Sequence, residues 1–408
     1  MNTKIRLTLM NFLQYAVWGA WLISLGAYLG NTLKFDGLQI GSFFATMGIA
    51  SLFMPAVMGI IADRWIPAQR LLGLCHLFAA GFITLAATRT DYNSLYTLVL
   101  LSVMFYMPTI ALSNSVAYNA LEKAGLDTVT HFPPIRVWGT VGFICAMWVV
   151  DLGKMGLSAT QLYFSATLGL ILGLYSFTLP NYPINRSGGG KSIVDLLGLR
   201  AFALFKQRKM AIFFIFSMLL GMSLQITNAF ADGYIKSFGD TGIHGAKYLG
   251  TFGVEHSTIL ISLSQISETL CILLIPFFLK RFGIKRVMLI AMFAWVLRFA
   301  LLGAGNPGPG VWMFILSMIV YGVAFDFFNI SGSLFVEKET SAAIRSSAQG
   351  VFMIMTNGLG ALIGSYLAGW VVNHYGWPLS WYLFAGFSLV VAIVFAVIFK
   401  YKHDPNRI

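Results

Sequence analysis

The segment NYPINRSGGGKSIVDLLGLRAFALFKQRK, residues 181–209, separates two long apolar regions of the 408-residue chain. Its first part, NRSGGGKS, is rich in glycine and serine, a composition typical of flexible linkers. Its second part, LLGLRAFALFKQRK, is basic and amphipathic, as in helices that lie on a membrane surface. We therefore predict two halves, residues 1–180 and 209–408, joined by a surface linker over residues 181–208.

The composition excludes a water-soluble fold. Hydrophobic residues make up 58% of the chain and charged residues only 10%, whereas soluble domains have about 25% charged residues. The mean hydropathy of +0.77 agrees with this conclusion. A bilayer core requires roughly 20 apolar residues per helical span, so a chain of this length holds about twelve spans with short loops. No room is left for a large soluble domain.

Apolar runs on both sides of the linker match this expectation. They lie near residues 5–30, 38–62, 70–88, 94–121, 134–152 and 159–180, and near 209–233, 257–279, 285–304, 310–335, 344–373 and 379–400. We predict an all-α integral membrane protein with twelve transmembrane helices in two six-helix halves, the architecture of major facilitator transporters. The first run is too long for the apolar part of a signal peptide, so we expect it to be retained as a span.

The basic residues indicate topology rather than a nucleic-acid partner. The net charge is +12, but the basic residues occur in short clusters between apolar runs and not on one amphipathic face. With the N-terminus in the cytoplasm, few of the 27 basic residues fall in the opposite loops. Those few are Lys34, Arg89, Lys154, Lys236 and Lys247. The positive-inside rule therefore predicts that both termini and the linker are cytoplasmic.

Two loops at equivalent places in the halves are alike. GIIADRWIPAQR, residues 59–70, follows the second predicted span, and LKRFGIKR, residues 279–286, follows the eighth. Each resembles the loop signature G-x-x-x-D-R-x-G-R-R of the major facilitator superfamily. The first loop lacks the second glycine and the second lacks the aspartate. The alternative interpretation is that these are simply cytoplasmic anchoring charges.

Four charged residues lie within the predicted spans, where a charge costs several kcal/mol. They are Arg136 in the fifth span, Glu268 in the eighth, Arg298 in the ninth and Asp326 in the tenth. Each is a functional candidate for this reason. The alternative is that they form ion pairs that hold helices together. We expect Arg298 to be paired or to snorkel toward the interface rather than to contact a substrate.

Helical spacing places polar and aromatic neighbours on the same faces as these charges. The faces consist of Arg136, Thr140 and Phe143; Gln225 and Asn228; Gln265 and Glu268; and Tyr321 and Phe325 with Asp326 beside them. Together they supply rings for stacking, amides for hydrogen bonding and carboxyls that exchange protons. A flat, polar, uncharged ligand suits such groups, and both nucleosides and sugars are of this kind.

Other polar residues give weaker signals. Gln14, Trp18 and Trp21 on the first span could line a cavity or pack against neighbouring helices, and the sequence leaves both open. The three cysteines, Cys75, Cys145 and Cys271, lack metal-ligand spacing, so we expect no metal and no cofactor. No G-x-x-x-x-G-K-[ST] loop occurs, which leaves an ion gradient as the expected energy source.

Four long segments carry a specific resemblance. They are FPPIRVWGTVGF at 132–143, MAIFFIFSMLLG with LQITN at 210–228, SQISETLCILLIPFFLKRFGIK at 264–285 and MIVYGVAFDFFNISGSLFVEKE at 318–339. These segments resemble the bacterial nucleoside:proton symporter family, and the similarity covers nearly the whole chain. The chain departs from the family pattern in the loop after the seventh span and in a shorter C-terminal tail. The preferred nucleoside therefore stays open.

The resemblance implies a nucleoside site between the halves. The matching positions are Arg136, Thr140, Phe143, Gln225, Asn228, Gln265, Glu268, Tyr321, Phe325 and Asp326. It implies that amides and Glu268 hold the ribose and base, that aromatic rings stack on the base, and that an acidic residue carries the coupled proton. Asp326 is the leading candidate for that proton, with Glu268 as the alternative.

The predicted function is proton-coupled import of nucleosides, such as uridine, adenosine or xanthosine, across a bacterial inner membrane by alternating access. The protein is expected to be a monomer in the lipid bilayer, without nucleic-acid partner. One alternative is a porter of sugars or other small polar solutes on the same fold. Another is a membrane receptor without transport. An enzyme would require a nucleophile with a base, and the sequence shows none.

Overall fold

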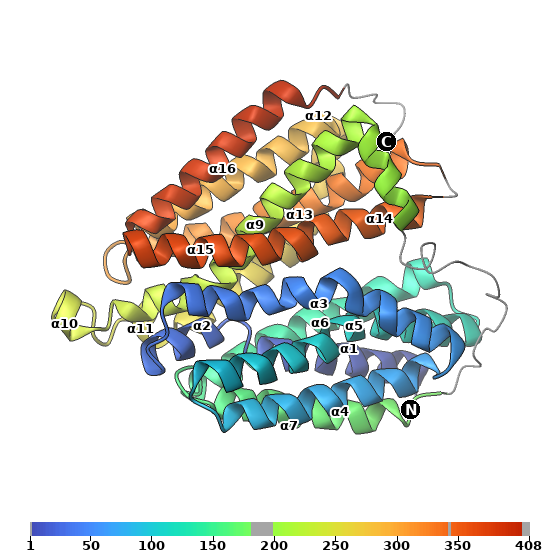
Figure 1. The fold of residues 1–408 in the computed structure, drawn as a ribbon, viewed down its shortest axis with the longest axis horizontal. Coiled ribbons are helices and arrows are strands. Elements are labelled where there is room, and N and C mark those ends of the chain that lie inside the picture. The colour runs from blue at the N-terminus through green and yellow to red at the C-terminus, as the bar shows by residue number, and fades with distance from the viewer. Residues whose placement is uncertain (1, 181–198, 342–343, 402–408) are drawn as a thin grey trace. The chain divides into compact units, whose positions relative to one another are not determined.

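The computed structural model describes residues 2–180, 199–341 and 344–401. Every regular element among these residues is a helix, as Figure 1 shows, so the predicted all-α class is confirmed. Residues 181–198 of the predicted linker lie outside the described residues. The remainder of the linker forms a 3-10 helix, η2 (Leu199–Lys206), and the next helix begins at Arg208.

The chain divides into two compact units. The first unit comprises Met1–Phe35 and Ile49–Leu196, and the second comprises Asp36–Gly48 and Leu197–Ile408. Helix α3 therefore contributes to both units, and the predicted boundaries at residues 181 and 209 stay a prediction.

Seven helices and one π-helical turn precede the linker. They are α1 (Thr3–Gly19), α2 (Leu25–Ala27), η1 (Tyr28–Thr32), α3 (Gly37–Arg64), α4 (Ala68–Ala87), α5 (Tyr92–Lys123), α6 (Thr128–Leu152) and α7 (Thr160–Ser176). After η2 come α9 (Arg208–Ser237), α10 (Thr241–His244), α11 (Phe252–Glu255), α12 (Ser257–Ala304), α13 (Val311–Glu339), α14 (Arg345–Met353), η3 (Ile354–Gly360), α15 (Ala361–Tyr375) and α16 (Leu379–Ile398).

Nine helices of the described residues are long and apolar enough to cross a membrane, whereas the sequence predicts twelve spans. Part of the difference comes from α12, whose 48 residues contain two predicted spans. Gly283, with φ 74°, interrupts the helical geometry between them, in a conformation that glycine adopts readily. Helices α1 and α7 have 17 residues each, fewer than the roughly 20 of a typical crossing. The number twelve stays a prediction.

Glycines allow α1 and α6 to pack backbone against backbone. A Cβ at Gly142 would collide with the carbonyl oxygen of Phe12, and one at Gly19 would collide with that of Phe143. Small residues permit such close approach between membrane helices, where van der Waals contact drives association. The contact fixes the position of α6, which carries three of the predicted site residues.

The core of the first unit joins the remaining helices to this pair. Buried apolar side chains of α1, α4, α5, α6 and α7 form one cluster with the second half of α3. Its fully buried members include Met10, Leu72, Val116, Leu121 and Leu172. Because the lipid is as apolar as these side chains, their contribution to stability comes mainly from packing.

We expect Gly142→Ala to destabilise the protein by about 1–3 kcal/mol, because the added methyl group forces α1 and α6 apart. The matched control is Gly81→Ala on α4, where a Cβ meets nothing within 4 Å. The measurement is thermal unfolding of both purified variants in detergent. Equal melting temperatures for the two variants would contradict the close packing of α1 on α6.

Candidate functional site

Tyr321 and Phe325 lie one turn apart on α13 and stack on each other. Their ring centroids are 5.6 Å apart and their planes differ by 4°. Trp295 of α12 meets Tyr321 edge-on, with 6.0 Å between centroids and 88° between planes. Both arrangements are favourable for aromatic pairs. Tyr321 and Phe325, called the aromatic platform below, thus form an ordered surface of which Phe325 is the more exposed part.

Two carboxyl groups lie beside the aromatic platform. Asp326 follows Phe325 directly and is buried, while Glu268 on α12 is half-buried. The two carboxyls interact electrostatically with each other and with Tyr321. Within the described residues, Oδ2 of Asp326 has no hydrogen-bond partner. Because two negative charges repel at close range, the pair is better suited to holding a proton than to holding both charges.

Gly322 sets the close approach of α12 and α13. A Cβ at Gly322 would lie 2.6 Å from the backbone of Ser267 and 2.7 Å from Sγ of Cys271. The Ser267 hydroxyl also donates to a carbonyl oxygen of α13. Because Gly322 follows Tyr321 and Ser267 precedes Glu268, this contact brings the carboxyl of one helix near the ring of the other.

Arg298 is held inside the protein by hydrogen bonds; it does not snorkel, and the described residues give it no ion pair. Its side chain is on α12 and is only 2% exposed. Nη1 donates to the carbonyl oxygen of Ser317 at 2.7 Å, and the Ser317 hydroxyl donates back to the carbonyl oxygen of Arg298 at 3.0 Å. A further contact of 3.4 Å joins Nη1 to the hydroxyl of Ser264. The two bonds with Ser317 join α13 to the part of α12 that follows Gly283.

The predicted amide faces are also on the second unit. Asn228 donates to Oε1 of Gln225 at 3.4 Å on α9, so these two amides form one hydrogen-bonding surface. On α12, Oε1 of the half-buried Gln265 has no hydrogen-bond partner within the described residues. A buried amide oxygen without a partner is unfavourable by about 1–3 kcal/mol, so it is disposed to accept from a ligand.

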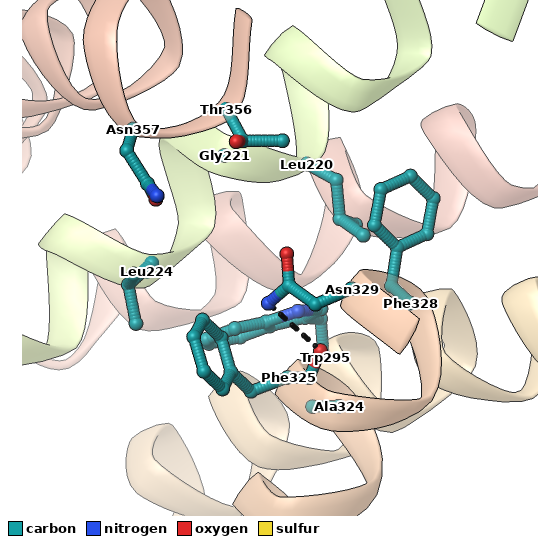
Figure 2. Close-up of a pocket in the computed structure, with 10 residues that line it drawn as sticks. All are labelled: Leu220, Gly221, Leu224, Trp295, Ala324, Phe325, Phe328, Asn329, Thr356 and Asn357. Atoms are coloured by element: carbon teal, nitrogen blue, oxygen red, sulfur yellow. Dashed lines mark hydrogen bonds between the residues drawn. The ribbon is translucent and has the colours of Figure 1, made fainter. Parts of the chain in front are cut away.

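A small cavity lies next to the aromatic platform (Figure 2). Ten residues of four helical elements line it: Leu220, Gly221, Leu224, Trp295, Ala324, Phe325, Phe328, Asn329, Thr356 and Asn357. Its volume of about 20 Å³ suffices for about one water molecule. Ligand pockets usually measure about 300–1,000 Å³, so this cavity by itself does not hold a nucleoside.

Of these ten lining residues, the sequence analysis predicted only Phe325 as a site residue, and the missed ones include Trp295, Asn329 and Asn357. Asn329 could have been found, because it continues the stripe of Tyr321 and Phe325 by one further turn. In the structure its amide donates to the carbonyl oxygen of Phe325 at 3.1 Å, the dashed line of Figure 2. Trp295 and Asn357 belong to other helices, and no pattern within a single helix connects them to α13.

On the first unit, the predicted stripe of α6 packs against α1. Arg136 is half-buried, and its Cζ lies 3.9 Å from the centroid of the Tyr15 ring. Phe143 is buried and meets Trp18 edge-on at 6.3 Å. Thr140, which lies between these two residues in the sequence, is half-buried. The guanidinium therefore already has an aromatic partner within its own unit.

A buried polar network on the first unit was not predicted as such. Nε2 of His76, fully buried on α4, lies 2.7 Å from Oε1 of Gln14 on α1. The Gln14 amide donates to Thr109 of α5 at 2.7 Å, and the Tyr106 hydroxyl donates to the Gln14 carbonyl oxygen at 2.7 Å. Because the side-chain oxygen Oε1 of Gln14 can only accept a hydrogen bond, Nε2 of His76 carries a proton. Gln14 thus joins three helices.

A second polar cluster fastens the start of α12 to the end of α9. The buried carboxylate of Asp232 pairs with Lys236 at 2.6 Å. Ser257 and Thr258 donate to its other oxygen, at 2.5 and 3.0 Å. Both carboxylate oxygens have hydrogen-bond partners, so the cluster is structural.

The described residues contain no group of three or more His, Cys, Asp or Glu side chains placed to hold a metal ion.

Long apolar helices with charged, amide and aromatic side chains buried among them define a multi-pass membrane transporter. The family model described as nucleoside H+ symporter matches residues 1–404. The nucleoside permease NupG of Escherichia coli strain K12 is 51% identical over 99% of this chain and 97% of its own length. The xanthosine permease of the same strain is 50% identical over 100% and 98%. A crystal structure of the nucleoside transporter NupG matches with a TM-score of 0.91 at 51% identity, covering 98% of this chain and 100% of that one.

The chain therefore belongs to the nucleoside H+ symporter family, and the resemblance noted from its sequence is confirmed. It is a proton-coupled nucleoside transporter and not an enzyme. The major facilitator type of fold expected from the sequence is confirmed with it.

We expect Phe325→Ala to weaken uridine binding by about 1–3 kcal/mol, roughly 5- to 150-fold, because the substitution removes a stacking surface for the base. The matched control is Phe277→Ala on α12, whose ring is 64% exposed. The measurement is isothermal titration of both purified variants with uridine. If Phe325→Ala binds uridine as tightly as Phe277→Ala, the aromatic platform is not a substrate contact.

Proposed function

We propose that Asp326 and Glu268 form the proton-binding pair of this transporter and that nucleosides bind at the faces predicted from the sequence. The proposed substrate contacts are Arg136, Thr140, Phe143, Gln225, Asn228, Gln265, Glu268, Tyr321, Phe325 and Asp326. The observation that carries the proposal is the buried carboxyl of Asp326, which adjoins the aromatic platform and has one oxygen without a protein partner among the described residues. Asp326 is the leading proton carrier, and Glu268 is the alternative.

The placement of Asp326 accounts for coupling. A proton drives a conformational change only if it interacts differently with the two conformations. Asp326 and the aromatic platform are on the same helix, α13, and Glu268 faces them from α12. Protonation removes the repulsion between the two carboxyls, which favours close packing of α12 and α13. A change in the packing of the two helices also moves the ring of Phe325, which is on α13.

The groups of the second unit suit the chemistry of a nucleoside. A nucleobase is flat and stacks on rings, whereas ribose presents hydroxyl groups that both donate and accept hydrogen bonds. Phe325 supplies the stacking surface, and the amides of Gln225, Asn228 and Gln265 supply donors and acceptors. None of these four side chains is charged, in keeping with an uncharged substrate.

Arg136 contributes through its planar guanidinium. Its Cζ lies 3.9 Å from the centroid of the Tyr15 ring, a cation–π distance. This stacking sets the plane in which its N–H groups point. Its five N–H donors lie in one fixed plane and can form paired hydrogen bonds to a base or ribose. An ammonium group also donates hydrogen bonds, but it lacks this planar arrangement. We assign Thr140 and Phe143, on the same stripe of α6, to the same substrate-contacting role.

The proposed setting is a bacterial inner membrane, with both termini in the cytoplasm. Two observations support it, the excess of basic residues on the side of the termini and the permease names of the two Escherichia coli relatives. The proposed substrates are nucleosides such as uridine, adenosine and xanthosine, because one relative is a nucleoside permease and the other a xanthosine permease. We propose that the protein acts as a monomer within the lipid bilayer.

We expect Arg136→Lys to lower the rate of uridine uptake on the order of tenfold, because a point charge loses both the stacking on Tyr15 and the planar array of donors. The measurement is uptake of radiolabelled uridine into proteoliposomes. Arg89→Lys, an exposed arginine beyond α4, serves as the matched control. Uptake by Arg136→Lys at the rate of this control would reduce Arg136 to a packing role.

We expect Asp326→Asn to abolish the accumulation of uridine driven by a pH gradient, because asparagine mimics the protonated carboxyl permanently. Exchange of internal for external uridine moves no net proton, so it should persist at least in part. Both activities are measured in proteoliposomes, with and without an imposed pH gradient.

The matched control for this experiment is Asp91→Asn. Asp91 is an exposed N-cap of α5, and hydrogen bonds from Ser94 hold the pKa of this carboxyl below its usual value, so it stays ionised in the assay. Asparagine caps helices as well as aspartate does. If Asp326→Asn still concentrates uridine while Glu268→Gln does not, the proton belongs to Glu268.

A further inference from the structure

Arg298 carries a buried positive charge without an ion pair among the residues that the structure describes. Its Cζ lies 4.7 Å from the centroid of the Tyr321 ring. The same ring stacks on Phe325 and interacts electrostatically with both Glu268 and Asp326. Tyr321 therefore contacts the guanidinium on one helix and neighbours both carboxyls.

The contact with the ring is specific to a guanidinium. A guanidinium is planar and weakly hydrated, so it stacks on an aromatic face more favourably than an ammonium does. The bonds from Nη1 to Ser317 and Ser264 hold one end of the guanidinium. Since Trp295 meets Tyr321 edge-on, and Trp295 and Arg298 are three residues apart on α12, one face of this helix orients the ring.

We propose that Arg298 is a positioning residue of the transport site: its guanidinium holds the ring of Tyr321 in the aromatic platform. This inference rests on the proposed role of the aromatic platform in binding nucleosides. It differs from the proposed function in assigning a role to a residue that touches neither substrate nor proton.

The first test is the affinity of purified variants for uridine. Arg298→Met should weaken binding about three- to tenfold, because the ring of Tyr321 loses its planar support. Lys280→Met, an exposed cation on the same helix, is the control for the loss of charge and should bind uridine as the wild type does.

The second test is a double-mutant comparison of uridine affinity, which does not depend on whether Arg298→Met folds. Arg298→Lys alone should weaken binding about three- to tenfold, because the ring of Tyr321 loses its planar support. In a Tyr321→Leu background the same substitution should have no further effect. Equal losses in both backgrounds would show that Arg298 does not act through Tyr321.

The outcomes separate this inference from the proposed function. Wild-type uridine affinity in Tyr321→Leu would overturn the aromatic platform as a substrate contact. A weakened Tyr321→Leu variant together with an Arg298→Lys variant of wild-type affinity would overturn only the role of Arg298. Non-additive affinities support the positioning of Tyr321.

Discussion

A charge inside a bilayer costs several kcal/mol unless the protein supplies partners for it, and the second unit is organised by this constraint. One group of its charges is gathered where α12 meets α13, and another, the ion pair of Asp232 and Lys236, lies where α9 meets the start of α12. Arg298 is bonded to Ser317 and lies against Tyr321, while Glu268 and Asp326 neighbour the same ring. The two carboxyls repel each other when both are ionised, and a bound proton removes that repulsion. A carboxyl pair in this place is therefore suited to proton coupling.

Small residues make this arrangement sterically possible. Gly322 lets α13 approach the backbone of Ser267, which places the carboxyl of one helix beside the ring of the next. Gly19 and Gly142 do the same for α1 and α6 in the first unit. In both units the close backbone contact is adjacent to a predicted site residue, so packing and function depend on the same positions. A larger residue at any of them would move a functional side chain as well as lower stability.

Much of this organisation could be predicted from the sequence, because helical periodicity determines which side chains share a face. The stacking of Tyr321 on Phe325 and the contact of Gln225 with Asn228 follow from spacings of four and three residues. Contacts between helices could not be predicted in this way. The bonds of His76 with Gln14, and the contacts of Arg136 with Tyr15 and of Arg298 with Tyr321, join residues far apart in the sequence. The break at Gly283 agrees with the sequence, because the predicted spans 257–279 and 285–304 lie on either side of it.

The central claim is that a carboxyl pair beside the aromatic platform moves a proton with each nucleoside. Proton movement can be measured directly with a pH-sensitive dye in weakly buffered proteoliposomes, without any imposed gradient. When uridine is added outside, the account predicts alkalinisation of the external medium that follows uridine entry and stops when a proton carrier is replaced. Uridine entry at the normal rate with no change in external pH would contradict it.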